Sequence, residues 1–572
     1  MLSIKSSFKT FFIVALLGAL YATRLSSAPR IPAQVIDNGL IYCTYASGFS
    51  FNPQTAEAGV SMNVVTEQIY NKLFSQKNHN AQISPELAQS YHISPDGKRI
   101  TINLRRGVKF HQTEWFTPTR DFNAEDVVFS LNRVLGKNDD LPTLDNVAVF
   151  DNRQYQIFNE LAKKAHFPYF DSINLKAKIA DVRATAPYQV QISLFEPDAS
   201  ILSHLASQYA VIFSREYALQ LNADNNLAQL DLLPIGTGAY KVKEYARNQY
   251  IRLQRHQDYW QQAAKIDNIV VDISTYRTGR LTKLLNGECQ IVAFPEVSQL
   301  GLFNEIDRGH QFNLKENEGM NLAFLAFNFN KPQMNDIKLR RAIAQSIDRQ
   351  RIIDHIYYGT ATLAENIIPH ISWANISATG FNLKYSPKIA RTWLAERQIV
   401  LNLWVINEDQ VYNPAPMKMA EMIKFDLAQV GVNVHIQQVS RNYLVQQLKH
   451  KQANYDLILT GWLASPSDPD TFLRPILSCA SKDDVTNLAN WCYPLFDQAI
   501  NQALIHSDQQ QRIQDYQQAE QIVASQLPII PLANVKQVFV FSKRIQGLEK
   551  WHFANINFAE LWLQENHKEQ QQ

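Results

Sequence analysis

The sequence lacks the short motifs that mark common hydrolases and metal sites. It contains no GxSxG nucleophile elbow, no HExxH motif, no CxxC pair, no CxxCH haem-attachment motif and no clustered Cys/His spacing. The formal net charge is only +2 at pH 7, so the chain has no strong overall field with which to attract nucleic acid. We therefore predict no enzyme, no metal, no cofactor and no specific nucleic-acid partner.

Long hydrophobic runs are also missing, apart from one short run near the N-terminus. Lys5 and Lys9 precede an apolar run at residues 11–21, and the small residues 26–28 follow as a cleavage pattern. Such a run is too short to cross roughly 30 Å of hydrocarbon, which excludes a membrane anchor. No cysteine stands directly after it to carry a lipid. We interpret residues 1–28 as a secretory signal peptide and expect a soluble, periplasmic mature protein.

Cysteine is scarce, with four residues in the whole chain: Cys43, Cys289, Cys479 and Cys492. An even number of cysteines in an exported protein is typical of disulfides. Four cysteines allow three pairings, and spacing alone does not select one of them.

The length and the pattern of elements indicate an α/β protein with more than one domain. A chain of 572 residues exceeds a single hydrophobic core, so two or three domains are expected. Short apolar strands alternate with amphipathic helices, without low-complexity segments or internal repeats. The expected strands are residues 241–245, 322–330, 400–406, 432–436, 455–462 and 535–541, and the expected helices are residues 336–358 and 415–429.

One region gives an especially clear local prediction. Residues 94–97 form a Ser-Pro-Asp-Gly turn signal ahead of a strand at 100–104, whose apolar residues alternate. A second strand is expected at 108–110. Asn123 then stands as a helix N-cap with Asp126 three residues later. His111 follows the second strand, and we predict a structural role for it.

A glycine-rich stretch, LLPIGTGAY at residues 232–240, invites a nucleotide-binding interpretation. No Gly-Lys-Ser/Thr follows and no helix is expected there, so we reject a P-loop. Together with segments 86–133 and 336–358, this stretch closely resembles the family 5 extracytoplasmic solute-binding proteins, the receptors of peptide, nickel and related ABC importers. The resemblance extends from about residue 40 to about residue 561.

The resemblance implies an α/β, two-lobed periplasmic binding protein fold (type II, cluster C) with an extra domain inserted in the first lobe. The implied boundaries are 36–316 plus 537–572 for lobe I, 72–205 for the inserted domain and 317–536 for lobe II. It also implies disulfides Cys43 to Cys289 and Cys479 to Cys492. A peptide or other small ligand in the interlobe cleft, an inner-membrane ABC permease as partner and a monomeric state are implied as well.

Two positions depart from the dipeptide-binding relatives of this family. Where those relatives place a carboxylate for the ligand's amino terminus, this chain has Ser465, and where they place an arginine for the ligand's carboxylate, it has Gln410. Each lost charge-assisted contact is worth about 1.5 to 3 kcal/mol. A simple dipeptide receptor is therefore disfavoured.

Further candidate ligand contacts each have a structural alternative. Acidic residues near the implied cleft could attract a cationic ligand, or lie on solvated loops. Aromatic residues could stack on a ligand, or pack in the core. The Asp-Pro-Asp sequence could face the ligand, or cap a helix from residue 471. These candidates are Tyr45, Glu57, Glu408, Tyr412, Trp462 and Asp468.

Residues 44–65 and the two missing anchors together resemble a branch of the family that is associated with resistance to cationic antimicrobial peptides. This resemblance implies a receptor that handles peptides. A receptor for haem or another non-peptide ligand is the alternative within the same class, and a peptide-processing enzyme is a less favoured one.

Overall fold

The computed structural model describes residues 39–44, 51–55, 64–76, 82–137, 166–223, 229–230, 232–273, 277–301, 305, 311–375, 380–394, 397–408, 410–464, 468–551 and 556–564. The expected signal peptide, residues 1–28, lies outside these ranges. No helix within them is long and apolar enough to cross a membrane.

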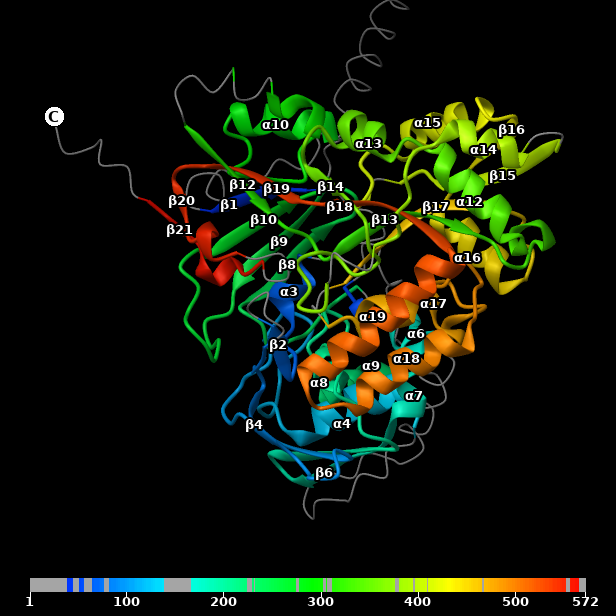
Figure 1. Ribbon diagram of the computed structural model, residues 1–572. Helices are drawn as coiled ribbons and strands as arrows, with labels where there is room; N and C mark the ends of the chain where they lie inside the picture. Colours follow the sequence, from blue (N-terminus) through cyan, green and yellow to red (C-terminus); the bar gives the residue numbers. More distant parts are fainter. Residues whose placement is uncertain are drawn as a thin grey trace, which may run out of the picture.

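A seven-stranded mixed sheet forms the first large layer (Figure 1). β1 lies at its centre and pairs in parallel with β10 and β11, whereas the outer pairings are antiparallel. In spatial order the strands are β12 (Phe312–Asn317), β19 (Gln537–Ser542), β11 (Ile291–Ala293), β1 (Leu40–Cys43), β10 (Asn268–Asp272), β9 (Tyr250–Arg255) and β8 (Tyr240–Ala246).

A six-stranded mixed sheet forms the second large layer. β15 pairs in parallel with β16 and β17, as expected for a strand, helix, strand unit, and β13 pairs antiparallel with β17 and β18. The order is β14 (Ala361–Leu363), β18 (Ile529–Val535), β13 (Asn321–Phe327), β17 (Leu457–Leu463), β15 (Ile399–Ile406) and β16 (Val432–Val439). We call residues 321–535, which contain this sheet, the six-stranded body.

The chain passes between the two large sheets twice, and the two passages run side by side. β12 and β19 are antiparallel neighbours in the first sheet, and their continuations β13 and β18 are antiparallel neighbours in the second. The side-chain amide of Asn321 donates to the Val535 carbonyl at 2.7 Å and accepts from the Val535 N–H at 2.8 Å. A two-stranded ribbon thus continues from one sheet into the other.

A smaller antiparallel sheet lies apart from the large ones, at the bottom of Figure 1. Its order is β4 (Ala88–Ile93), β5 (Arg99–Leu104), β7 (Gln189–Leu194) and β6 (Ile179–Ala186). We call residues 82–205, as far as they are described, the four-stranded region. Two short hairpins complete the sheets: β2 (Phe74–Gln76) with β3 (Ile83–Pro85), and β20 (Ile545–Gln546) with β21 (Trp562–Leu563).

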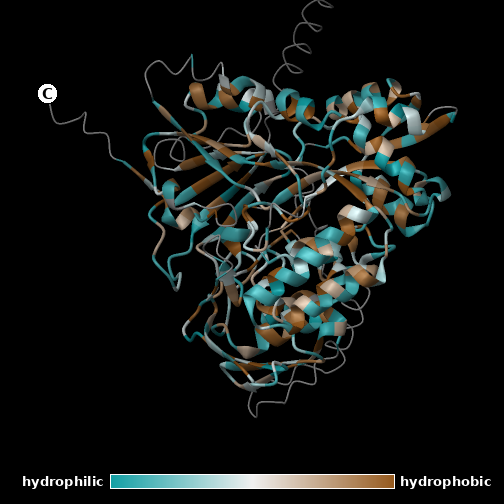
Figure 2. Cartoon of the chain, viewed as in Figure 1, coloured by the Kyte–Doolittle hydropathy of each residue, from teal (hydrophilic) through white to brown (hydrophobic). Residues whose placement is uncertain are grey.

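The helices cover the sheets and carry both hydrophilic and hydrophobic residues (Figure 2). Those that precede the six-stranded body are α3 (Thr66–Ile69), α4 (Ala124–Leu135), α6 (Pro168–Ser172), α7 (Leu175–Lys178), α8 (Ile201–Leu205), α9 (Arg215–Ala223) and α10 (Arg277–Leu285). Those within it are α12 (Ile337–Ser346), α13 (Arg349–Ile352), α14 (Pro387–Leu394), α15 (Pro416–Ala428), α16 (Arg441–Lys449), α17 (Asp470–Leu477), α18 (Pro494–Ile505) and α19 (Gln509–Gln526).

The structure confirms most of the elements expected from the sequence and corrects two. Asn123 and Asp126 form the predicted capping box at the start of α4. The strand expected at 108–110 is wrong: these residues are irregular, although Phe122 N–H donates to the Val108 carbonyl at 2.8 Å. The long helix expected at 336–358 is also interrupted. Asp348 caps a new turn there by accepting from the Arg351 N–H at 3.0 Å.

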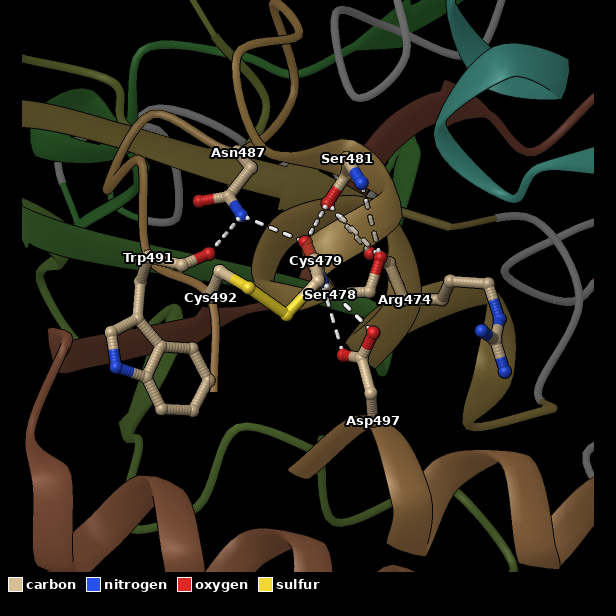
Figure 3. Close-up of a disulfide and its surroundings, with 8 residues drawn as sticks. All are labelled: Arg474, Ser478, Cys479, Ser481, Asn487, Trp491, Cys492 and Asp497. Atoms are coloured by element: carbon tan, nitrogen blue, oxygen red, sulfur yellow. Dashed lines mark hydrogen bonds between the residues drawn. A yellow bond between two sulfur atoms is a disulfide. The ribbon is translucent and has the colours of Figure 1, made fainter. Parts of the chain in front are cut away.

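Both disulfides have the pairing implied by the family resemblance, Cys43–Cys289 and Cys479–Cys492. The second closes a short loop between α17 and α18 (Figure 3). Asp497 on α18 accepts from the Cys479 N–H at 3.0 Å, and the Asn487 side chain donates to the Ser478 carbonyl at 3.1 Å. Covalent and hydrogen-bonded contacts together fix the C-terminal end of α17.

The glycines of the GTGAY stretch permit a close approach to α3. A Cβ on Gly236 would lie 2.0 Å from the Ile69 carbonyl oxygen, and one on Gly238 would lie 2.2 Å from that of Gln68. His111 donates through Nε2 to the Gly238 carbonyl at 2.9 Å and accepts from the Gly236 N–H through Nδ1 at 3.4 Å. The structural role predicted for His111 is confirmed.

His111 also faces His256, which shares the Gly238 carbonyl as its acceptor at 3.1 Å. The two ring centroids lie 4.8 Å apart, and His111 is fully buried. Burial lowers the pKa of His111 well below its ordinary value, and the neighbouring His256 lowers it further. Burial likewise lowers the pKa of His256. Both rings are therefore neutral near pH 7.

We predict that acidification destabilises the protein through this pair. In the unfolded chain both histidines bind protons below about pH 6.5, so stability is fully present above that pH and falls as the pH drops toward the folded-state pKa values. Each histidine should contribute a slope of at most about 1.4 kcal/mol per pH unit. Urea unfolding at several pH values between 7.5 and 5 measures how the free energy of unfolding depends on pH. His111→Gln should reduce the slope and the exposed control His92→Gln should not; equal slopes in both variants would contradict the prediction.

Candidate functional site

A small cavity of about 30 Å³, partly open to solvent, lies where the two large sheets meet the crossing ribbon. Its walls come from both sides of the molecule, because the loop after β11, the loop after β15 and the β18–β19 passage all contribute. The lining residues are Arg280, Phe294, Pro295, Val297, Thr360, Gln410, Val411, Pro414, Val535, Lys536 and Val538. We call it the junction pocket.

Gln410 reaches the junction pocket from a tight loop that follows β15. The Gln410 and Asn413 main chains exchange two N–H to carbonyl bonds, and the Asn413 side chain accepts from the Ala415 N–H at 3.2 Å just before α15. These bonds fix the loop and hold Gln410 at 4% exposure. Neither Nε2 nor Oε1 of Gln410 has a hydrogen-bond partner among the described residues. A buried amide in that state costs about 1 to 3 kcal/mol, so the site favours a polar occupant.

The cationic groups of the pocket wall are already engaged by the protein. Arg280 is 1% exposed and donates through Nη1 to the Ala293 carbonyl at 3.0 Å. Lys536 pairs with Glu316 at 2.8 Å, and this hydrogen bond raises the pKa of Lys536. Phe294 and several valines supply apolar surface. The arrangement therefore offers a neutral amide beside an apolar wall.

Two of the aromatic candidates are packed inside the six-stranded body. Trp462 is 2% exposed and donates through Nε1 to the Thr471 carbonyl at 3.0 Å. Tyr412 is also 2% exposed, its carbonyl accepts from the Tyr357 hydroxyl at 3.0 Å, and its ring lies against Gly461. These contacts are of the core-packing kind, and a ligand role for either residue stays a prediction.

Two of the acidic candidates are bonded to other parts of the protein. Glu408 is half-buried and accepts from the Arg441 N–H at 2.9 Å, at the start of α16. Asp468 is 3% exposed, pairs with Arg512 at 2.9 Å and accepts from the Asp470 N–H at 3.0 Å. That last bond lies just before α17, but the N-cap of the helix is Pro469 and the helix begins at Asp470, so the expected cap of a helix from residue 471 is not formed.

Of the named candidates, only Gln410 lines the junction pocket. Tyr45, Glu57 and Ser465 lie outside the described residues, so their roles stay predictions. Cys43, Asp272 and Cys289 are the one group with metal-ligand spacing in the described part of the chain. Both of these cysteines are joined in a disulfide, which leaves a single carboxylate there.

Several pocket residues carry no sequence signal. Phe294 follows a buried strand and adopts φ 49°, a conformation rare for a bulky residue and invisible in the sequence. Thr360 and Val535 belong to an irregular loop and a buried strand, respectively. The proline that follows Phe294 would favour an extended conformation for it, so the observed positive φ depends on the tertiary arrangement.

We compared the chain with known proteins. The family described as bacterial extracellular solute-binding proteins, family 5, matches residues 82–484. The peptide transport periplasmic protein SapA of Haemophilus influenzae is 57% identical over 96% of this chain and 98% of its own length. The haem-binding protein A of the same organism is 32% identical over 91% of this chain and 92% of its own length.

A solved structure is similarly close. The dipeptide-binding protein of a Pseudoalteromonas species, in complex with Met-Leu, matches with a TM-score of 0.80 and 32% identity, covering 92% of this chain and 100% of that one. This match confirms the predicted fold class, an α/β, two-lobed periplasmic binding protein. The matches also confirm the family resemblance and the resemblance to the SapA branch.

We predict that Gly461→Ala destabilises the six-stranded body. A Cβ there would lie 2.3 Å from Cδ2 of Tyr412 and 2.6 Å from the Leu322 carbonyl oxygen. Overpacking of this kind costs about 1 to 3 kcal/mol. Denaturant unfolding gives the change in the free energy of unfolding. The matched control is Gly301→Ala, where a Cβ meets nothing within 4 Å; a loss below about 0.5 kcal/mol at Gly461, or an equal loss in both variants, would argue against the packing.

Proposed function

Because the chain belongs to the family 5 bacterial extracellular solute-binding proteins, we propose that it is the periplasmic receptor of an ABC importer of the SapA type. In this proposal the signal peptide is removed on export, and the mature monomer binds a peptide and delivers it to an inner-membrane permease. The receptor binds its ligand without chemical turnover. The near full-length similarity to SapA supports the proposal.

The observation that carries the proposal is the buried amide of Gln410 in the junction pocket, which has no hydrogen-bond partner among the described residues. The pocket draws its walls from both sides of the crossing ribbon, so a ligand bound there contacts both and favours their approach. A site that leaves a donor and an acceptor unpaired gains the most from a ligand that pairs both. A peptide bond offers one N–H and one carbonyl, which matches an amide side chain.

The same geometry disfavours a terminal carboxylate at this position. Gln410 cannot form a charged bidentate pair, and Arg280 and Lys536 already have protein partners. Ser465, outside the described residues, offers a hydroxyl where dipeptide-binding relatives carry a carboxylate. We therefore propose that the ligand is held along its backbone and by its shape, with less weight on its charged ends. Domain boundaries at 316/317 and 536/537, with an inserted domain at 72–205, are part of the proposal.

Mass spectrometry of the small molecules that co-purify with the native protein tests the function directly. We expect peptides, because a ligand that contacts both sides of the crossing ribbon should be retained through purification. Haem is the second candidate, since the haem-binding protein A of Haemophilus influenzae is 32% identical to this chain. A Soret band, an empty list after mild purification, or hydrolysis of a bound peptide would each contradict the proposed receptor.

We predict that restoring the two charged anchors converts the protein toward dipeptide binding. Gln410→Arg combined with Ser465→Asp should strengthen the affinity for a free dipeptide at least tenfold, since each charge-assisted bond is worth about 1.5 to 3 kcal/mol. Isothermal titration calorimetry measures the change. Asn407→Arg with Ser465→Asp is the matched control, because Asn407 is an exposed residue beside the same loop. No gain over that control would refute the assignment of Gln410 to the ligand.

A further inference from the structure

A second contact joins the six-stranded body to the four-stranded region, away from the crossing ribbon. In Figure 1, helices α17, α18 and α19 lie beside α6, α7 and α8. α17 to α19 fall between β17 and β18 in the chain, and α6 to α8 flank β6 and β7. The contact is therefore made between parts of the chain that are distant in sequence.

Asp470, at the start of α17, is the centre of this contact and is fully buried. From its own helix, Arg474 pairs with it at 2.8 Å. From the four-stranded region, His204 Nε2 lies 3.0 Å from Oδ2 of Asp470, and Lys178 Nζ lies 3.6 Å from the same oxygen. Burial alone would raise the pKa of Asp470, but Arg474, Lys178 and His204 together hold it well below its usual range. The side chain is thus an ion whose partners come from both sides.

The partners on the four-stranded side are themselves fixed. Lys178 pairs with Asp198 at 2.5 Å. The hydroxyl oxygen of Tyr169 lies 3.0 Å from Nδ1 of His204. One main-chain bond crosses the contact beside them: the Ala199 N–H donates to the Leu504 carbonyl of α18 at 2.8 Å. An ordered set of donors and charges therefore faces Asp470.

A buried cluster of ion pairs is suited to an interface that opens and closes. A buried ion pair gains Coulombic energy but loses hydration, so its formation is close to balanced and separation into water costs little. Removing one partner while the contact stays shut leaves a buried charge uncompensated, which is strongly unfavourable. Loss of a partner therefore favours the separated arrangement.

We propose that Asp470, His204 and Lys178 form a closure latch that holds the six-stranded body against the four-stranded region when the lobes are shut. The two large sheets are joined by the crossing ribbon at one place, and the latch joins the molecule at a second. Asp470 and Lys178 are positioning residues: they set the open and closed populations without contacting the junction pocket.

Amide hydrogen exchange provides a readout specific to the latch. The Ala199 N–H is bonded across the contact, whereas the Ala206 N–H is bonded to the Leu202 carbonyl at the end of α8, on one side only. Opening of the contact breaks the hydrogen bond of the Ala199 amide and leaves that of the Ala206 amide intact. General destabilisation increases exchange at both.

The test uses the full-length mature protein without ligand, so it is independent of what the pocket binds. Asp470→Asn keeps the side-chain shape and removes the charge; we expect Ala199 exchange, read by mass spectrometry, to rise at least tenfold with Ala206 unchanged. Small-angle X-ray scattering should show a larger radius of gyration. Lys178→Met changes the four-stranded side of the contact and should also raise Ala199 exchange and the radius of gyration. This second variant tests the latch if Asp470→Asn does not fold.

The matched control is Lys176→Met. Lys176 lies on the same helix α7, and its partner Asp171, at 3.5 Å, belongs to the same side. This variant should leave Ala199 exchange and the radius of gyration at wild-type values. Equal Ala199 exchange in wild type and both latch variants, or a parallel rise at Ala199 and Ala206, would overturn the latch.

Discussion

The crossing ribbon is the constraint on which the rest of the architecture depends. Both strands must complete hydrogen-bonded ladders in two different sheets, and the turn between sheets leaves main-chain groups that need other partners. The side chain of Asn321 meets this need by bonding both polar groups of Val535. Gly319 fits the same passage because a Cβ would lie 2.5 Å from the Val535 carbonyl oxygen. The sheets are thereby held in register while remaining separate layers.

The polar chemistry of the molecule is divided between two places with opposite character. At the junction pocket the protein leaves Gln410 buried and unpaired, which favours an external partner. Around Asp470 the protein supplies every counter-charge itself, and the ionised form is stabilised. The polar groups of the first place are left for a partner outside the described residues, and those of the second are paired within the protein.

Local chemistry was predictable from the sequence where it depended on neighbouring residues. The Asn123 capping box rests on contacts within three residues, and the sequence predicts it. The strand expected at 108–110 is wrong because no strand of the described residues pairs with it, and only the tertiary arrangement decides that. The family resemblance indicates Gln410 as a candidate. The side-chain amide has no hydrogen-bond partner among the described residues, and that depends on the packing of segments distant in the sequence. The role of His204 rests on a residue 266 positions away.

Each of the two disulfides lies within one half of the molecule. Cys43–Cys289 joins β1 to the segment just before β11, and Cys479–Cys492 closes a loop inside the six-stranded body, so neither crosses the ribbon. All four cysteines are used in this way. The disulfides therefore constrain each half separately, and the separation between the halves depends on non-covalent forces. Formation of the disulfides and movement of one half against the other are therefore mechanically independent.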